Sequence, residues 1–186
     1  MSGPTAGDDG AIEIGLRIAT PQDAVALRDL EKAANLASLG HVFPPADHPY
    51  PDECVLARWR GTLVEPGVCV EVVDGPRRLL AFAAYDATTL RHLAVHPESW
   101  RSGLGRVMVQ RAVAGIAASG AERAVLWCLR ANTRACGLYA HLGWRETGRT
   151  RQAGWPPYPL EEEHELILRR SEPETRRLRG EVRPVR

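Results

Sequence analysis

A short glycine-containing segment, Trp100-Arg-Ser-Gly-Leu-Gly-Arg106, has the residue types of an anion-binding site. It lies between an apolar, strand-like run at residues 92–97 and a helix-like run at residues 107–119. Where a strand passes through glycines into a helix, unpaired backbone N–H groups converge and the helix dipole adds partial positive charge. Gly103 and Gly105 have no Cβ, so phosphate oxygens can approach the main chain closely. The segment therefore predicts a site for a phosphate or pyrophosphate group.

Two common phosphate-binding motifs do not fit this segment. The dinucleotide-binding pattern requires a third glycine three residues after Gly105, where this chain has Met108. The P-loop pattern requires a lysine after its last glycine, and Lys32 is the only lysine in the sequence. A tight strand-to-helix turn without a ligand remains the alternative for the segment taken by itself.

A second segment follows about thirty residues later, with Asn132, Ala135, Leu138-Tyr139 and Gly143-Trp144 in order. Together the two segments resemble the acetyl-CoA-dependent N-acetyltransferases of the GCN5-related (GNAT) superfamily. The first resembles that family's basic-x-x-Gly-x-Gly/Ala loop, and the second resembles its Asn-x-x-Ala-x-x-Leu-Tyr-x-x-x-Gly-Trp/Phe element. The motifs span residues 88–148, and a matching order of elements extends the resemblance from residue 12 to residue 170. One position departs from the family pattern, because Trp100 stands where an arginine or glutamine is usual.

The resemblance implies a fold of the α/β (α+β) class: a mixed, mostly antiparallel sheet of about seven strands, splayed between strands 4 and 5, with helices on both faces. Alternation of apolar and polar residues predicts a strand at residues 12–18, and runs between turn residues predict strands at 68–73, 79–85 and 88–95. Residues 124–129 read as a buried strand, and residues 144–148 and 163–168 complete the order of elements as the last pair of strands. Capping residues predict that a first helix begins near Thr20-Pro21. Helical spacing predicts three more helices, at residues 53–60, 107–119 and 133–142.

Composition limits the classes of protein to which the chain can belong. With 186 residues, 44% hydrophobic residues and a net charge of +1, it fits one enzyme-sized domain without a bulk polyanion partner. It has neither a membrane-length apolar run nor a signal segment, and its four cysteines lack CxxC or metal spacing. We therefore expect a cytoplasmic protein with reduced thiols, no metal and no membrane partner.

We expect three regions along the chain. Residues 1–10 read as a disordered N-terminal segment, residues 11–170 as the acetyltransferase domain and residues 171–186 as a charged tail. The arginines of the tail make a nucleic-acid partner an alternative, but no aromatic residue is interleaved for base stacking, so a solvated tail is favoured. The sequence is compatible with a homodimer but does not indicate the oligomeric state.

The resemblance implies transfer of an acetyl group from acetyl-CoA, as co-substrate, to a primary amine. It assigns cofactor binding to one strand, to the glycine loop and to the second segment, namely Leu93, Ala94, Val95, Arg101, Ser102, Gly103, Leu104, Gly105, Arg106, Asn132 and Ala135. The N–H of Val95 is the expected oxyanion donor, a group that typically contributes about 3 kcal/mol to lowering the barrier. Asn132 has two readings, as the cap of the following helix or as a partner of the cofactor's amide arm.

Tyr139 is the expected general acid. Its spacing from Ala135 and Leu142 turns it inward on a helix, and a phenol stays protonated near neutral pH. The alternative is a core tyrosine with a satisfied hydroxyl. For the general base we weigh His92, beside the oxyanion strand, and Glu163, in an acidic run that otherwise reads as a solvated strand edge.

Two loops have the residue types of an acceptor pocket, at residues 41–51 and 155–159. Prolines stiffen such loops, and aromatic side chains offer apolar walls with polar tips. We expect the acceptor to be a small amine, an antibiotic or a peptide N-terminus. The residues of the two loops do not favour one of these three classes over the others. The competing function is a domain of the same fold that binds acyl-CoA as a sensor without catalysis.

Overall fold

The computed structural model describes residues 15–168 of the protein. Its elements are β1 (Gly15–Ile18), η1 (Pro21–Asp23), α1 (Ala24–Leu39), α2 (Asp52–Thr62), β2 (Cys69–Asp74), β3 (Leu79–Tyr85), β4 (Thr89–Val95), η2 (Pro97–Ser99), α3 (Leu104–Ala118), β5 (Arg123–Leu129), α4 (Thr133–His141), β6 (Arg145–Gln152) and β7 (Leu160–Ile167). The order of strands and α-helices is the one predicted from the sequence. The proposed N-terminal segment and the arginine-rich tail lie outside the described residues.

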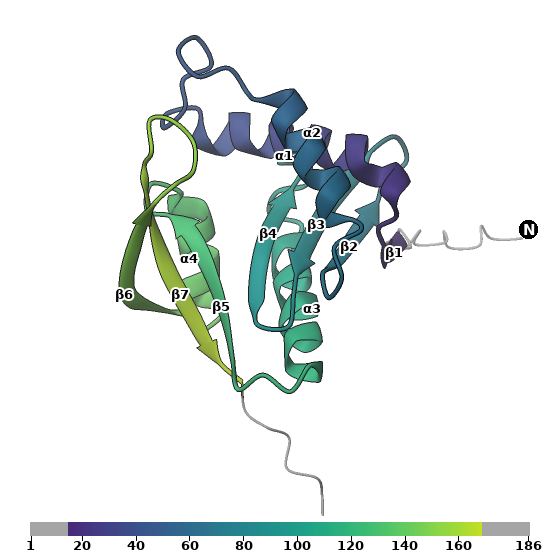
Figure 1. The fold of residues 1–186 in the computed structure, drawn as a ribbon, viewed down its shortest axis with the longest axis vertical. Helices are drawn as coiled ribbons and strands as arrows, with labels where there is room; N and C mark the ends of the chain where they lie inside the picture. Colours follow the sequence, from purple (N-terminus) through teal and green to yellow (C-terminus); the bar gives the residue numbers. More distant parts are fainter. Residues whose placement is uncertain (1–14, 169–186) are drawn as a thin grey trace, which may run out of the picture.

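The seven strands form one sheet in the order β1-β2-β3-β4-β5-β7-β6 (Figure 1). Every neighbouring pair is antiparallel except β4 and β5, which run parallel. The ladder between β4 and β5 consists of Thr89 with Val125 and Leu90 with Leu126, and the two strands then separate. This arrangement confirms the predicted mixed sheet that opens between its fourth and fifth strands.

Helices cover both faces of the sheet and bury two separate cores. On one face, α1 and α2 pack Leu27, Val55 and Trp59 against Val72 and Phe82 of the sheet. On the other face, the buried side of α3 packs against β3 to β5, and α4 adds Tyr139 to the same cluster. Helix α1 turns one stripe of residues toward the sheet, and its buried residues include Ala24, Leu27, Leu30 and Ala34.

Within the described residues, three boundaries of these strands and of α3 differ from the predicted ones by three residues or more. Helix α3 begins at Leu104, three residues before the predicted residue 107, because Gly103 adopts a left-handed conformation and starts the helix there. Strand β6 continues to Gln152 rather than ending at residue 148, although nearly all its side chains are exposed. Strand β7 begins at Leu160 rather than residue 163, because its first residue pairs with Gln152.

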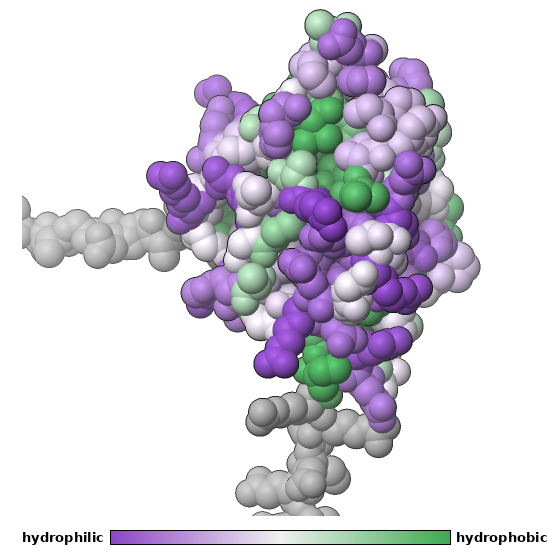
Figure 2. Space-filling view, turned by 90° about the vertical axis from the view of Figure 1, so that its left-hand side faces the viewer, coloured by the Kyte–Doolittle hydropathy of each residue, from purple (hydrophilic) through white to green (hydrophobic). Residues whose placement is uncertain are grey.

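The β6 side of the molecule is predominantly hydrophilic (Figure 2). Strand β6 is an edge of the sheet and exposes Arg145, Arg149 and Arg151. Charged side chains on an edge strand oppose edge-to-edge pairing with another chain. Within residues 15–168, no helix combines the length and the apolar character needed to cross a bilayer.

Candidate active site

The separation of β4 from β5 exposes main-chain groups of β4. An extra residue at Arg91 shifts the register, so that Ala84 pairs with His92 while Tyr85 pairs with Leu90. The N–H of His96 donates to the carbonyl of Leu80 at 2.8 Å. Because antiparallel partners alternate in the direction of their hydrogen bonds, Val95 and Leu93 then direct their N–H and C=O groups away from β3 and into the gap.

The glycine loop places the first turn of α3 beside this gap. Gly103 has φ 89° and Arg101 has φ 68°, so the loop passes through left-handed conformations on its way into the helix. The amides of Gly105 and Arg106, in the first helical turn, have no intrahelical acceptor. A Cβ on Gly105 would lie 3.2 Å from Cδ2 of Leu138 in α4, so a larger residue there would require the leucine side chain to shift.

A cleft of about 500 Å³ lies where the loop, β4 and α4 meet. Most of the residues predicted to bind the cofactor line it, namely Leu93, Ala94, Val95, Arg101, Gly103, Gly105, Arg106, Asn132 and Ala135. Ser102 and Leu104 do not: the Ser102 hydroxyl donates to the Ser99 carbonyl at 2.7 Å, and Leu104 is buried in the core. The structure therefore brings nine of these eleven residues together around one cleft, and their binding of the cofactor stays a prediction.

Trp100, the departure from the family loop, connects the two sides of the cleft. Its indole Nε1 donates to the carbonyl oxygen of Val95 at 2.8 Å. The guanidinium carbon of Arg134, in the first turn of α4, lies 3.9 Å from the centroid of the Trp100 ring, which is a cation–π contact. Arg134 thus places a positive charge beside Trp100, the loop position at which the family usually has a basic residue or glutamine.

Helix α4 presents Asn132 and Tyr139 differently. The Asn132 side-chain oxygen accepts from the Ala135 amide at 3.2 Å, so Asn132 caps α4 while it also lines the cleft. Tyr139 is 7% exposed and its ring contacts Trp144 and His164. Among the described residues, Tyr139 does not line the cleft, but its neighbour on the helix, Leu138, does. Burial, and then the neighbouring Cys128 and Cys136, raise the pKa of Tyr139, so its phenol stays protonated.

The cysteines beside Tyr139 are not suited to act as nucleophiles. The Cys136 thiol lies 3.6 Å from Cys128 Sγ, and burial raises the pKa of both thiols. A thiolate, the reactive form of cysteine, is therefore disfavoured at both positions.

His92, one of the two expected bases, lies on the opposite side of the sheet from Leu93. Its ring centroid is 5.6 Å from that of Trp59 in α2. Burial, followed by the positive charges of Arg58 and Arg91, lowers the pKa of His92 to about 3. In this position the imidazole is a weak proton acceptor, and among the described residues it lines neither the cleft nor the pocket described below.

Glu163, the other expected base, is held in an ion pair within the sheet. Its carboxylate accepts from the Thr147 hydroxyl at 2.9 Å and from the Arg149 guanidinium at 3.0 Å, and the residue is 7% exposed. The other acidic residues of the run are also paired with arginines: Glu161 with Arg151, Glu162 with Arg130 and Glu165 with Arg123. This run therefore stabilises the outer strands, and its charges are already balanced.

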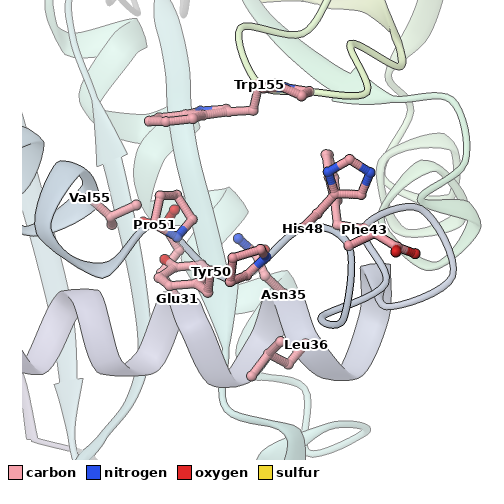
Figure 3. Close-up of a pocket in the computed structure, with 12 residues that line it drawn as sticks. Glu31, Asn35, Leu36, Phe43, His48, Tyr50, Pro51, Val55 and Trp155 are labelled. Carbon is pink, nitrogen blue, oxygen red and sulfur yellow. The ribbon is translucent and has the colours of Figure 1, made fainter.

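A second cavity, of about 320 Å³, lies between the two loops that were expected to bind the acceptor (Figure 3). The loop after α1 contributes Phe43 and residues 47–51, and the loop between β6 and β7 contributes Trp155 and Pro156. Helix α1 supplies the floor with Glu31, Asn35 and Leu36. We call this cavity the acceptor pocket.

Asn35 lines both the cleft and the acceptor pocket, so the two cavities meet at α1. The sequence analysis did not select Asn35, nor Ala34 and Ser38, which also line the cleft. Asn35 lies beside the buried stripe of α1. Asparagine is a poor helix former, and its presence inside a helix was the one sequence signal that could have indicated a functional position. Arg134 was missed as well, because its partner Trp100 is distant in sequence.

Comparison with known proteins identifies the family to which the chain belongs. The model of the acetyltransferase (GNAT) family matches residues 24–144, which is most of the described chain. The chain is a member of the GNAT acetyltransferase family. A search of curated protein sequences finds no significant match.

Solved structures of several acetyltransferases share the fold. The structure of yncA from Salmonella typhimurium, a putative acetyltransferase with its cofactor acetyl-CoA, is 19% identical, covers 88% of this chain and 99% of its own, and has a TM-score of 0.63. The ribosomal-protein-S18-alanine N-acetyltransferase from Escherichia coli is 20% identical, covers 82% of this chain and 92% of its own, and has a TM-score of 0.59. PaiA N-acetyltransferase from Thermoplasma acidophilum, in complex with coenzyme A, is 14% identical over 82% of this chain and 98% of its own, with a TM-score of 0.61. These similarities establish the GNAT fold.

Proposed function

We propose that this protein is an N-acetyltransferase that moves an acetyl group from acetyl-CoA directly to a primary amine of a small molecule or peptide. The observation that carries the proposal is the meeting of the cleft and the acceptor pocket at Asn35. One cavity offers main-chain donors and arginines, and the other offers apolar walls for a second molecule. Two substrates bound in these cavities would face each other across one short boundary.

The cleft has the donor groups that coenzyme A requires. The unpaired amides of Gly105 and Arg106 suit a pyrophosphate at the start of α3, and Arg101, Arg106 and Arg134 add positive charge around it. The main-chain groups of Leu93 suit an amide of the pantetheine arm, whereas the Val95 carbonyl already accepts from the Trp100 indole. Acetyl-CoA would supply the acetyl group as a reactive thioester.

The residues that line the cleft, and Tyr139 behind them, have separate tasks in this proposal. The Val95 N–H stabilises negative charge on the thioester oxygen, in the manner of an oxyanion hole. Tyr139 holds the proton that the departing thiolate requires, and the raised pKa of its phenol keeps that proton in place. Asn132 orients the start of α4 while contacting the pantetheine arm. Transfer is direct, because the thiols of Cys128 and Cys136 stay protonated.

The proton of the incoming amine needs an acceptor near the acceptor pocket. His92 and Glu163, proposed from the sequence, are disfavoured by their surroundings, since one is a weak base and the other is bound to Arg149. His48 lies in the lining of the pocket and carries an imidazole, the side chain that most often serves as a general base. We therefore assign the task to His48, directly or through water.

We further assign the catalytic domain to residues 11–170 and place the protein in the cytoplasm. Free thiols at all four cysteines suit a reducing compartment. Within residues 15–168, no cluster of three or more His, Cys, Asp or Glu side chains is arranged to hold a metal.

The second candidate function is a domain that binds acyl-CoA without transferring the acyl group. It is favoured by Trp100 in the loop and by the burial of Tyr139 behind the cleft lining. Amine-dependent release of the CoA thiol separates the two functions, and replacement of Tyr139 by phenylalanine tests the proposed acid. For an acetyltransferase we expect this variant to lose about a hundredfold or more in kcat, because it lacks the acid, while its affinity for acetyl-CoA is unchanged.

The measurement combines calorimetric titration with acetyl-CoA and a free-thiol assay over a panel of amines. Binding of acetyl-CoA together with amine-dependent thiol release supports the enzyme. Binding without release by any amine supports the non-catalytic domain, and no binding refutes both functions. Full activity of Tyr139→Phe would remove Tyr139 from its role as the acid.

A further inference from the structure

The acceptor pocket has features that select among amines, and this inference rests on the proposed function. We propose that the acceptor is a small primary amine carried on a planar apolar group, with no carboxylate beside the amine. Phenethylamine is the simplest compound of this kind.

The walls of the acceptor pocket are mostly apolar and flat. They include Leu36, Phe43, Pro49, Pro51, Val55 and Trp155. In Figure 3 the Trp155 indole lies on one side of an open space, and Pro51 and Tyr50 lie on the opposite side of that space. A planar group placed in this space would stack on the indole and contact the proline and tyrosine rings. At about 320 Å³, the cavity is at the small end of the usual 300–1,000 Å³ for small-molecule sites.

The charges of the pocket oppose an anionic substituent. Among residues 15–168, the charged side chains of its lining are Glu31 and Asp47, and none of the lining residues is an arginine or lysine. Glu31 is partly neutralised, because one of its oxygens accepts from Trp59 Nε1 at 2.8 Å and from Arg58. Nearby Lys32 is bound to Asp52 at 2.6 Å. A carboxylate entering the pocket would lose its hydration without gaining a cationic partner, whereas an ammonium group would be tolerated.

The position of Asn35 fixes the orientation of the acceptor. The amine must reach the boundary with the cleft, where Asn35 lies, because the acetyl group would approach from that side. The rest of the acceptor then extends away from the cleft, toward Trp155 and the prolines. A substrate without an apolar body would leave these walls unfilled and would bind weakly.

Steady-state kinetics with three amines tests the proposal. Phenethylamine and phenylalanine share the ring and the amine and differ by a carboxylate, while ethanolamine lacks the ring. We expect kcat/KM for phenethylamine to exceed that for each of the others by at least about tenfold. A dipeptide with an N-terminal phenylalanine serves as a fourth acceptor, because it retains the ring but extends the chain beyond the small pocket.

Two loop variants locate the effect. Trp155→Ala should raise KM for phenethylamine about tenfold, and more than it raises KM for ethanolamine, because stacking is lost. Leu160→Ala is the matched control: Leu160 follows the same loop and is 44% exposed, against 43% for Trp155, but does not line the pocket. We expect the control to have the kinetics of the wild-type protein.

The outcomes separate this inference from the proposed function. If phenylalanine, ethanolamine or the dipeptide is acetylated as efficiently as phenethylamine, the inference is wrong while the acetyltransferase assignment stands. An unchanged KM for phenethylamine in Trp155→Ala would also overturn it. If the protein binds acetyl-CoA but acetylates no amine, the proposed function itself fails, and this inference fails with it.

Discussion

At the scale of single residues, Trp100 shows how a departure from a family pattern can be compensated by a distant side chain. The loop lacks the usual basic residue, and the tryptophan instead binds the Val95 carbonyl and stacks against Arg134. The sequence showed the departure, but it could not show the partner, because the contact joins a loop to a different helix. The stacked guanidinium keeps exposed N–H groups that can contact a phosphate.

Replacement of Arg134 tests whether it supplies the missing charge. We expect Arg134→Ala to weaken binding of acetyl-CoA about tenfold, because a charged contact and a cation–π interaction are both lost. Isothermal titration at two salt concentrations measures this, and the variant should show the weaker salt dependence. Arg130→Ala is the control, since Arg130 is exposed and paired with Glu162 outside the cleft lining. Equal affinities in the two variants would contradict the assignment.

Other single residues show what residue type can and cannot predict. The helical spacing of Tyr139 correctly predicted that it turns inward, because periodicity determines which side of a helix is buried. The surroundings of His92 and Glu163 were not predictable in the same way. Trp59 and Arg149, which lie against them, come from other elements, and these contacts decide whether an imidazole or a carboxylate is available as a base.

At the scale of elements, the start of α3 combines a structural role with a binding role. Gly103 has φ 89°, which an L-amino acid with a side chain rarely adopts, and a Cβ there would meet no atom within 4 Å. Gly120, just after the other end of α3, has φ 87° and is equally free of neighbours. The two glycines therefore have the same conformational role at opposite ends of one helix.

This pair allows the two roles of Gly103 to be separated. Gly103→Ala and Gly120→Ala should each lower the free energy of unfolding by about 1 kcal/mol, because each places a side chain in the left-handed region. Only Gly103→Ala should also weaken acetyl-CoA binding, since it alone disturbs the amides of the loop. Chemical denaturation and titration calorimetry measure the two effects. Equal affinities for acetyl-CoA in both variants would argue that the loop does not bind the pyrophosphate.

The boundaries of β6 show where pattern analysis of an element fails. Its eight residues, Arg145–Gln152, are almost all polar and exposed, so there is no apolar alternation to detect. The strand is held by main-chain pairing with β7, with a register shift between Glu146 and Thr150. Buried strands such as β3 and β5 follow the predicted bounds closely, because their side chains must be apolar.

At the scale of the whole molecule, the sites lie where the sheet opens. One half of the sheet, β1 to β4, carries α3, and the other half, β5 to β7, carries α4, while α1 passes over the opening (Figure 1). The resemblance to a known family predicted this opening and most of the cleft. The acceptor pocket was predicted as two loops, but its meeting with the cleft at Asn35 depends on how α1 lies across the sheet. No local pattern in the sequence contains that information.

Burial of His92 between the sheet and α2 makes the stability of the whole protein depend on pH. Its pKa is lowered from about 6.5 in an unfolded chain to about 3, mainly by burial. The unfolded chain therefore binds more protons than the folded one between these two values. The contribution of neutral His92 to stability is present in full above pH 6.5 and is lost as the pH falls toward 3.

The His92→Gln variant tests this dependence. Between pH 7.5 and pH 4.5, we expect the wild-type protein to lose roughly 2 kcal/mol more unfolding free energy than the variant, as measured by urea denaturation. Paired carboxylates are the same in both proteins and therefore cancel in this difference, and Asp23, whose pKa Arg17 lowers to about 2, titrates below the range used. His41→Gln is the control, because it makes the same substitution at an exposed position. If His92→Gln instead follows the wild-type protein over this range, the imidazole takes up its proton in the folded state, and its role as a general base becomes open again.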